Sequence, residues 1–219
     1  MEFKPGILWE YRVFLLQGVV NTLILALTAQ GLALAVAVPT AVARLRARGP
    51  WRRVAGAYVE FVRGTPALTQ LFWIFYCIPI FIGVEWSPLI GAIVALGLNV
   101  GAYDAEALRA GIQSVHFGQV QAARALGMSA WTTFGAVVLP QATRHVLPAL
   151  LNNFIGLLLY TSIASTIGVH ELTYAGGKLN TATFQSVVVF TGVAGLYLAI
   201  SVSASAGVRR LERAQARRD

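Results

Sequence analysis

The stretch VFLLQGVVNTLILALTAQGLALAVAVPTAV, from Val13 to Val42, carries no charged side chain. A helix needs about 20 apolar residues to cross the hydrocarbon core of a bilayer, so this stretch is long enough to span it with some tilt. Pro39 could end or kink the helix near its far end. The stretch does not resemble a secretory signal, whose apolar core has about 7–15 residues and follows a basic region. It predicts a helix that crosses the membrane and stays in the protein.

The composition of the whole chain is that of a membrane protein. Of its 219 residues, 57% are hydrophobic and only 12% are charged, whereas about a quarter are charged in a soluble domain. The single cysteine, Cys77, excludes an intrachain disulfide. We therefore expect an all-α integral membrane protein that forms one transmembrane domain over residues 1–219. Its five expected spans run from Val13 to Val42, about Gly56 to Ile82, Pro88 to about Tyr103, about Leu147 to Val169, and about Val187 to Val208.

Lysine and arginine lie unequally on the two sides that five spans define. Fourteen of them fall in the connections after the first and third spans, at the start of the second span, and after the fifth span. The other side carries only Lys4, Arg12 and Lys178. Because basic residues stay in the cytoplasm, the amino terminus is expected outside and the carboxyl terminus inside. The net charge of +8 therefore indicates topology and not nucleic-acid binding, since no aromatic residues interleave the arginines.

The long connection between the third and fourth spans, about residues 114–143, has a different character. Residues Gln121 to Leu126 are good helix formers, and Gly127 suits the left-handed position that ends a helix. Ser129 can cap a second helix, which Pro140 is expected to end. The pattern predicts two short helices joined by a glycine turn. From composition alone, such a unit either fits a groove on a partner protein or lies on the lipid surface as an amphipathic elbow.

Several segments of this chain match a known family. Ala122-Ala123, followed by Gly127 and then by Leu139-Pro140, resembles the EAA coupling motif of ABC importer permeases. More closely, the chain resembles the polar amino-acid permease subunits of the histidine, glutamine and arginine type, over nearly its whole length. The further matching segments are Glu60 to Pro66, Gln70-Leu71, Asn99, Gly101 to Tyr103, Ala105-Glu106, Arg109, Gly111 to Ser114, Gly118-Gln119, Leu147-Pro148, Asn152, Thr161-Ser162, Ser165, Ile167 to Val169 and Glu171-Leu172.

The resemblance implies a type I ABC importer-like fold in the cytoplasmic (inner) membrane of a prokaryote. It implies a permease subunit that translocates a polar amino acid delivered by an extracytoplasmic binding protein. The subunit would not be an enzyme and would hold no cofactor, because ATP and Mg²⁺ are used by two separate nucleotide-binding ATPase subunits. A second permease subunit, identical or similar, would complete the dimer. The residues expected to couple to the ATPase are Gln121, Ala122, Ala123, Arg124, Leu126, Gly127 and Met128.

Two positions depart from the family pattern. Gln121 stands where the EAA motif has its acidic residue, so a neutral hydrogen bond would replace a charged contact with the ATPase. Leu159 and Tyr160 replace the basic and acidic pair that usually precedes Thr161-Ser162. If that pair touches substrate in relatives, this subunit would bind the substrate differently or leave it to its partner.

Polar residues inside the expected spans are costly in lipid and therefore indicate function. Glu60 and Arg63 share a helix face and could pair, either at a cytoplasmic hinge or along a substrate path. The hinge itself is expected at Gly64, Thr65 and Pro66, which can break the helix. The candidates for a polar substrate path are Glu60, Asn99, Asn152, Thr161, Ser162 and Ser165, and hydrogen bonding between helices is the alternative role for the uncharged ones.

The remaining polar groups favour structure over catalysis. Asp104, Glu106 and Arg109 are expected to form a salt-bridge network after the third span. No catalytic set and no metal-ligand spacing are present, which argues against a membrane-embedded enzyme. A channel or secondary transporter would have no use for the helix–glycine–helix connection. Gly97 and Gly101 form a GxxxG pattern, which serves either as a packing face within the subunit or as a dimer seam.

Overall fold

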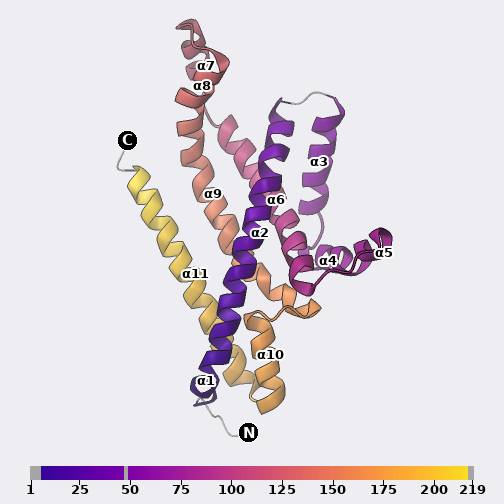
Figure 1. Ribbon diagram of the computed structural model, residues 1–219. Helices are drawn as coiled ribbons and strands as arrows, with labels where there is room; N and C mark the ends of the chain where they lie inside the picture. Colours follow the sequence, from indigo (N-terminus) through magenta and orange to yellow (C-terminus); the bar gives the residue numbers. More distant parts are fainter. Residues whose placement is uncertain (1–5, 47–48, 217–219) are drawn as a thin grey trace.

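The computed structural model describes residues 6–46 and 49–216, and these residues form helices and no strand (Figure 1). Two short π-helical segments and one 3₁₀ segment interrupt the α-helices. The α-helices are α1 (Gly6–Glu10), α2 (Arg12–Arg46), α3 (Pro50–Arg63), α4 (Ala67–Phe72), α5 (Ile78–Ile82), α6 (Pro88–Gln113), α7 (Phe117–Ala125), α8 (Ala130–Thr133), α9 (Leu139–Tyr160), α10 (Leu172–Thr183) and α11 (Ser186–Ala216). The π-helical segments are η1 (Trp73–Cys77) and η2 (Phe134–Val138), and the 3₁₀ segment is η3 (Thr161–Ile167).

The lengths of the helices bear on the predicted spans. Four helical stretches among the described residues are long and apolar enough to cross a membrane: Arg12–Arg46, Pro88–Gln113, Ala130–Ile167 and Ser186–Arg210. A fifth candidate is the pair Pro50–Arg63 and Ala67–Ile82, which is bent by 111° at its break. The second predicted segment is therefore not one straight helix. The helices at the third and fourth predicted spans, Pro88–Gln113 and Ala130–Ile167, are longer than the apolar segments predicted from the sequence. A helix can continue beyond an apolar segment as long as its backbone hydrogen bonds are made.

The bend between α3 and α4 lies at the predicted hinge residues. Pro66 has an extended backbone and no N–H to continue the helix, so α3 ends at Arg63 and α4 starts again at Ala67. The amide of Gln70 holds the break together. Its Nε2 donates to the carbonyl oxygen of Val62 at 2.7 Å and to Oγ1 of Thr65 at 2.6 Å. The geometry of the break is thus fixed, because a side chain of α4 hydrogen-bonds to residues that precede the break.

Pro140 does not end the second helix of the long connection, so that prediction is wrong. The helix continues from α8 through η2 into α9, as one stretch from Ala130 to Ile167. Immediately before the proline, the N–H of Leu139 bonds to the carbonyl of Phe134, five residues back. The same arrangement precedes Pro79, where the N–H of Ile78 bonds back to Trp73. In both places the wider π turn carries the helix past a residue that cannot donate.

The core of the protein is the close contact between α2 and α6. One face of α2 consists of fully buried alanines, namely Ala26, Ala29, Ala33 and Ala37. The GxxxG pattern of α6 meets this face. A Cβ added at Gly97 would lie 2.8 Å from Cδ2 of Leu32, and one at Gly101 would lie 3.1 Å from the backbone oxygen of Ala33. The small residues therefore pack two helices of the same subunit, which decides between the two roles considered for this pattern.

Candidate functional site

Helices α7 and α8 form a compact projection, here called the knob, at the far end of the extended α8–α9 stretch (Figure 1). The predicted glycine turn is confirmed: Gly127 has a φ of 80°. The N–H of Met128 bonds to Ala123 O at 3.1 Å and the N–H of Gly127 bonds to Arg124 O at 3.0 Å, which is the Schellman pattern. The predicted cap is also confirmed, since Oγ of Ser129 accepts from the N–H of Thr132 at 3.2 Å. Local hydrogen bonds thus fix the shape of the knob.

The outer surface of the knob is unusually apolar. Leu126 is 83% exposed at its tip, and Trp131 and Phe117 are 75% and 69% exposed on its flanks. Ala123 is only 4% exposed, so it belongs to the internal packing of the knob. Among the other residues predicted to couple to the ATPase, Gln121, Ala122, Arg124 and Gly127 are exposed and Met128 is half-buried. The knob thus offers an exposed apolar tip and, on α7, the exposed neutral amide of Gln121.

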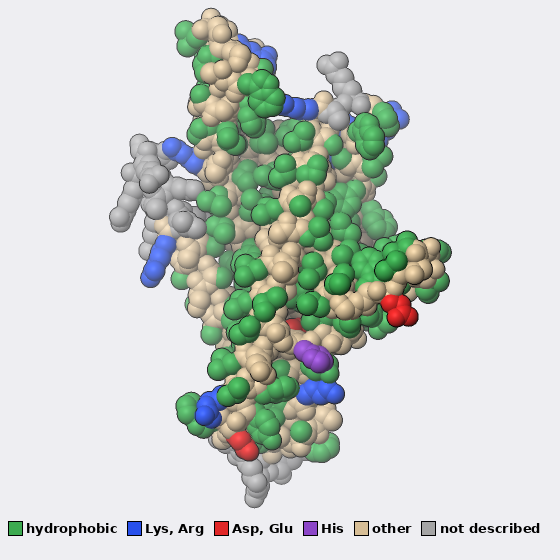
Figure 2. Space-filling view, viewed as in Figure 1, with side chains coloured by type: hydrophobic (Ala, Val, Ile, Leu, Met, Phe, Trp, Pro, Cys, Tyr) green, Lys and Arg blue, Asp and Glu red, His purple; other side chains and the backbone are tan. Residues whose placement is uncertain are grey.

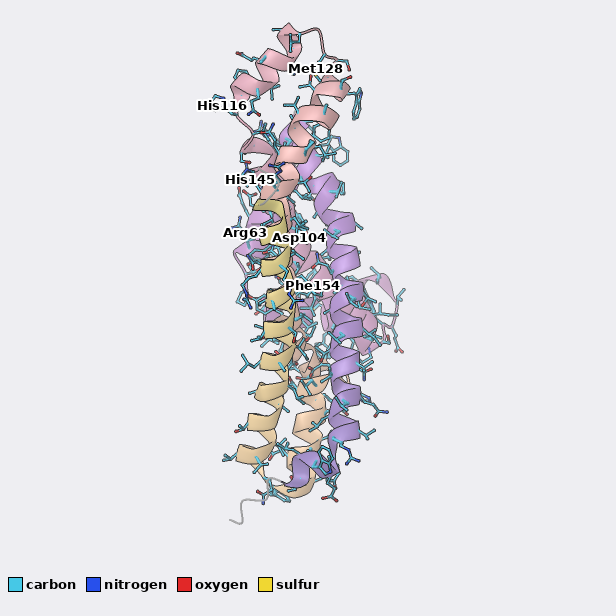
Figure 3. The ribbon with its side chains drawn as sticks, turned by 90° about the vertical axis from the view of Figure 1, so that its left-hand side faces the viewer. Arg63, Asp104, His116, Met128, His145 and Phe154 are labelled. Carbon is cyan, nitrogen blue, oxygen red and sulfur yellow. The ribbon has the colours of Figure 1, made fainter. Side chains whose placement is uncertain are left out.

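The knob contacts the end of α2. The guanidinium of Arg46 lies over the rings of Trp131 and Phe134, 5.5 and 5.6 Å from their centroids. His116, at the start of α7, caps that helix, because its Nδ1 accepts from the N–H of Gly118 at 3.1 Å. Figure 3 shows His116 and Met128 near this tip, and Asp104 nearer the middle of the molecule. The knob therefore contacts α2 and is also continuous with α9.

The predicted salt-bridge network forms only in part. The carboxylate of Glu106 pairs with Arg109 on its own helix and with Arg44 on α2. Asp104 is not part of this network. It is fully buried and accepts hydrogen bonds from Nε2 of Gln30 at 2.7 Å and from Nδ2 of Asn153 at 2.8 Å. These partners lie 74 and 49 residues away in sequence, and no local pattern points to them.

The residues predicted to line a polar path do not form one cluster in this subunit. Asn99 is buried on α6, where its Nδ2 donates to Oε1 of Gln70 at 2.9 Å. Its Oδ1 has no hydrogen-bond partner in the part of the chain that the structure describes. Asn152 is exposed, while its neighbour Asn153 turns inward to Asp104. Thr161, Ser162 and Ser165 belong to the 3₁₀ segment η3, and the hydroxyl of each donates to a carbonyl three residues back. Their role in a substrate path stays a prediction.

Glu60 and Arg63 do not pair in the described part of the chain. Glu60 is exposed and faces a basic pocket between α2, α3 and α6. The guanidinium of Arg63 instead lies over the ring of Tyr103, 5.4 Å from its centroid. The shared helix face is present, but α6 offers Arg63 an aromatic partner that the sequence of α3 does not reveal.

At the opposite end of the molecule, Glu171 joins two helices. Its carboxylate caps α10 by accepting from the N–H groups of Thr173 and Tyr174, at 2.9 and 2.8 Å. It also accepts from the hydroxyl of Tyr197 on α11 at 2.5 Å. Burial raises the pKa of Glu171 above its ordinary value, although these hydrogen bonds oppose the shift. The start of α10 is thereby fixed to α11.

Comparison with known proteins accounts for this architecture. The family described as "binding-protein-dependent transport system inner membrane component" matches residues 14–217. The glutamine transport system permease protein GlnP of Escherichia coli (strain K12) is 35% identical over 216 residues, which cover 97% of this chain and 98% of GlnP. The nopaline transport system permease protein NocM of Agrobacterium fabrum is 40% identical over 196 residues, 85% of this chain and 81% of that protein.

A solved structure agrees with these relatives. The crystal structure of an amino acid ABC transporter with histidines contains a chain that superposes with a TM-score of 0.92 at 32% identity. The superposition covers 97% of this chain and 99% of the other. The match extends from the long helices to the end that carries the knob. This chain belongs to the family of inner membrane components of binding-protein-dependent transport systems.

Proposed function

We propose that this permease subunit imports a polar amino acid and receives the force for transport through the knob. The family is a membrane component of importers, so ATP is hydrolysed by a separate subunit. The names of the relatives support the substrate class, since they transport glutamine and nopaline, and the superposable structure is an amino acid transporter. The observation that carries the coupling role is the apolar tip at Leu126, exposed on a projection that is held rigid by its own hydrogen bonds.

The direction of transport follows from the proposed orientation. The knob end, which also carries Arg44 and Arg46 at the end of α2, is assigned to the cytoplasm because basic residues stay inside. The end that carries α10 then faces the extracytoplasmic binding protein. Binding-protein docking at one end and ATP-driven movement of the knob at the other would shift the subunit between outward-open and inward-open states.

The partners proposed are two ATPase subunits, a second permease subunit and the binding protein. A second permease is supported by the surface of this one. The bent segment from α4 to α5 projects from the helix bundle, and Figure 2 shows hydrophobic side chains on the surface of this projection. Trp73, Tyr76 and Phe81 of this segment are exposed. Asn152, a predicted path residue, is likewise exposed on this subunit and would be covered only by a neighbour. The path would therefore lie between two permease subunits.

Substitution at the tip of the knob tests the coupling role. Leu126→Asp puts a charge on an 83% exposed side chain, so the fold of the subunit is retained. Burying a leucine contributes about 1.5–3 kcal/mol, so its loss should weaken binding of the ATPase at least about tenfold. Phe184→Asp is the matched control, because Phe184 is 82% exposed at the opposite end. Ala123→Asp is a poorer test, since Ala123 packs inside the knob.

The readouts are co-purification of the ATPase and ATP-dependent uptake in vesicles. We expect both to fall in Leu126→Asp and co-purification to be retained in Phe184→Asp. Equal retention in both variants would exclude the knob as the docking site. The substrate is identified separately, by measuring which of a panel of cationic, acidic and amide amino acids stimulates the ATPase with the binding protein present. Stimulation by leucine alone would exclude a polar substrate.

A further inference from the structure

A basic pocket of about 570 Å³ lies between α2, α3 and α6, beside the knob end of the molecule. It plays no part in coupling or in the proposed substrate path, apart from Glu60. The charged and polar side chains that line the pocket are Arg44, Arg52, Arg53, Glu60, Arg109 and Gln113.

The positive charge of the pocket is only partly neutralised. Arg44 and Arg109 both pair with the carboxylate of Glu106, so their guanidinium groups are held in place by one shared anion. Arg52 and Arg53 are exposed on α3, and the only acid lining the pocket is Glu60. Among the described residues, four arginines against Glu60 and Glu106 leave two positive charges in excess. The site is thus suited to an anion with one or two negative charges.

Helix α3 has three faces, and their order indicates where the anion comes from. One face, with Ala55, Val59 and Val62, is buried against the core. The next exposes large apolar side chains at positions 51, 54 and 61, a spacing that lines one side of a helix. The third face carries Arg52, Arg53 and Glu60 into the pocket. The basic face and the exposed apolar face are therefore adjacent along the helix.

We propose that this pocket binds the phosphate headgroup of an anionic phospholipid from the cytoplasmic leaflet. The acyl chains would lie along the exposed apolar face of α3, beside Trp51, Val54 and Phe61. Basic pockets between transmembrane helices on the cytoplasmic side are typical sites for anionic headgroups. This inference rests on the proposed orientation, which places the pocket at the cytoplasmic surface. A soluble phosphate would satisfy the arginines but would leave the apolar face of α3 without a role.

The lipid would act on the helix that leads to the hinge. The pocket joins α3 to α2 and α6, and α3 ends at the break that Gln70 holds. A headgroup bound to Arg52 and Arg53 on one side and to Arg44 and Arg109 on the other would tie α3 to the bundle. Anionic lipid is therefore a ligand that favours the state in which these three helices lie together.

The test uses the purified complex of the permease with its ATPase and follows retained lipid by native mass spectrometry. Phosphatidylglycerol and phosphatidylcholine are titrated separately, and inorganic phosphate is added as a competitor. One variant is Arg52→Gln with Arg53→Gln, which leaves the Glu106 pairs intact. Its control is Arg209→Gln with Arg210→Gln, which removes the same charge from exposed positions on α11. A second pair is Ala57→Glu against Ala57→Gln, at an exposed position on the pocket wall.

We expect the wild-type complex to retain phosphatidylglycerol in preference to phosphatidylcholine. An arginine near an anionic surface contributes about a fivefold change in binding, so the Arg52 and Arg53 variant should bind phosphatidylglycerol about 30-fold more weakly. The Ala57→Glu variant should lose binding and Ala57→Gln should keep it. Equal losses in the α11 control, or no preference between the two lipids, would overturn the proposal.

Two further results would give the pocket another role and would also overturn the proposal of a lipid site. Displacement of the lipid by inorganic phosphate at equal concentration would indicate a free-anion site. If the Arg52 and Arg53 variant loses co-purification of the ATPase but retains lipid, the pocket is part of the interface with the ATPase. Lipid retention is measured without transport, so a loss of lipid binding tests only the lipid proposal. A loss of amino-acid uptake tests the proposed function.

Discussion

Asp104 offers a substitution whose result depends on hydrogen-bond geometry inside the helix bundle. Its carboxylate is fully buried and accepts from Gln30 on α2 and Asn153 on α9, so that it links three helices. The side-chain oxygen of Gln30 is buried and has no hydrogen-bond partner among the described residues. Two variants separate the effect of shape from that of hydrogen bonding. Asp104→Asn keeps the shape and removes the charge, whereas Asp104→Leu keeps the size and removes both acceptors.

The two variants should differ clearly in stability. In Asp104→Leu, the amide groups of Gln30 and Asn153 both lose their acceptor. Hydrogen bonds between membrane helices contribute about 0.6 kcal/mol on average and about 1.7 at most, so two of them amount to about 1–3 kcal/mol. In Asp104→Asn, the amide of Gln30 can turn over and present its unpaired oxygen to the new donor. The number of unpaired buried atoms then stays the same, and stability should lie within about 0.5 kcal/mol of wild type.

The assay is the thermal midpoint of the purified complex in detergent, measured for both variants in parallel. A double-mutant cycle with Gln30→Leu isolates the coupling between Gln30 and Asp104, which should lie in the same range of about 0.6–1.7 kcal/mol. If Asp104→Asn is as destabilised as Asp104→Leu, the amide of Gln30 does not turn over, and the carboxylate itself is required. Unchanged stability in both variants would show that the network contributes nothing.

Three further predictions concern packing, pH and the knob. Gly97→Ala should destabilise the complex by about 1–3 kcal/mol, because the added methyl group meets a leucine of α2 at 2.8 Å; Gly195→Ala, whose methyl group meets nothing within 4 Å, should be neutral or stabilising in the same thermal assay. The raised pKa of Glu171 means that the folded state holds this proton more tightly than the unfolded chain does. The stability that Glu171 contributes is therefore present below about pH 4.5 and is lost as the pH rises through the raised pKa. The thermal midpoint of Glu171→Gln should consequently rise relative to that of the wild type as the pH is raised. A difference between the two midpoints that stays constant across pH would refute the pKa shift. Arg46→Gln removes the cation held over Trp131, a contact of about 0.5–1 kcal/mol, and should speed amide hydrogen exchange in residues 117–133 about two- to fivefold; unchanged exchange would mean that the contact does not restrain the knob.

Local chemistry explains which parts of the fold could be predicted from the sequence. Gly127 and Ser129 were predictable because the left-handed turn and the helix cap depend on residues within five positions of each other. The long helices were predictable because their apolar runs exceed the thickness of a bilayer. The break at Pro66 was also expected, since proline lacks the donor that a helix needs. Its angle of 111° was not, because it depends on how Gln70 bonds across the break.

Contacts between distant residues explain what the sequence could not reveal. Asn152 and Asn153 are adjacent and chemically identical, and only the rotation of α9 decides that Asn153 reaches Asp104. Arg44 meets Glu106 across 62 residues. Pro140 led to the wrong prediction that the helix ends there. The helix continues, because the π turn before Pro140 accommodates a residue that has no N–H to donate. Polar side chains in a membrane protein are easily found in a sequence, but their partners are set by packing.

That π turn has a geometric consequence for the knob. A bond that reaches five residues back encloses one residue more than the ordinary helical bond, so η2 acts as a single inserted residue between α8 and α9. Each residue of an α-helix advances the chain by about 100° around the axis and about 1.5 Å along it. Deleting one residue between Phe134 and Val138 would therefore turn Leu126 about a quarter of the way around the α9 axis. The direction in which the knob points therefore depends on the length of the chain at this one turn.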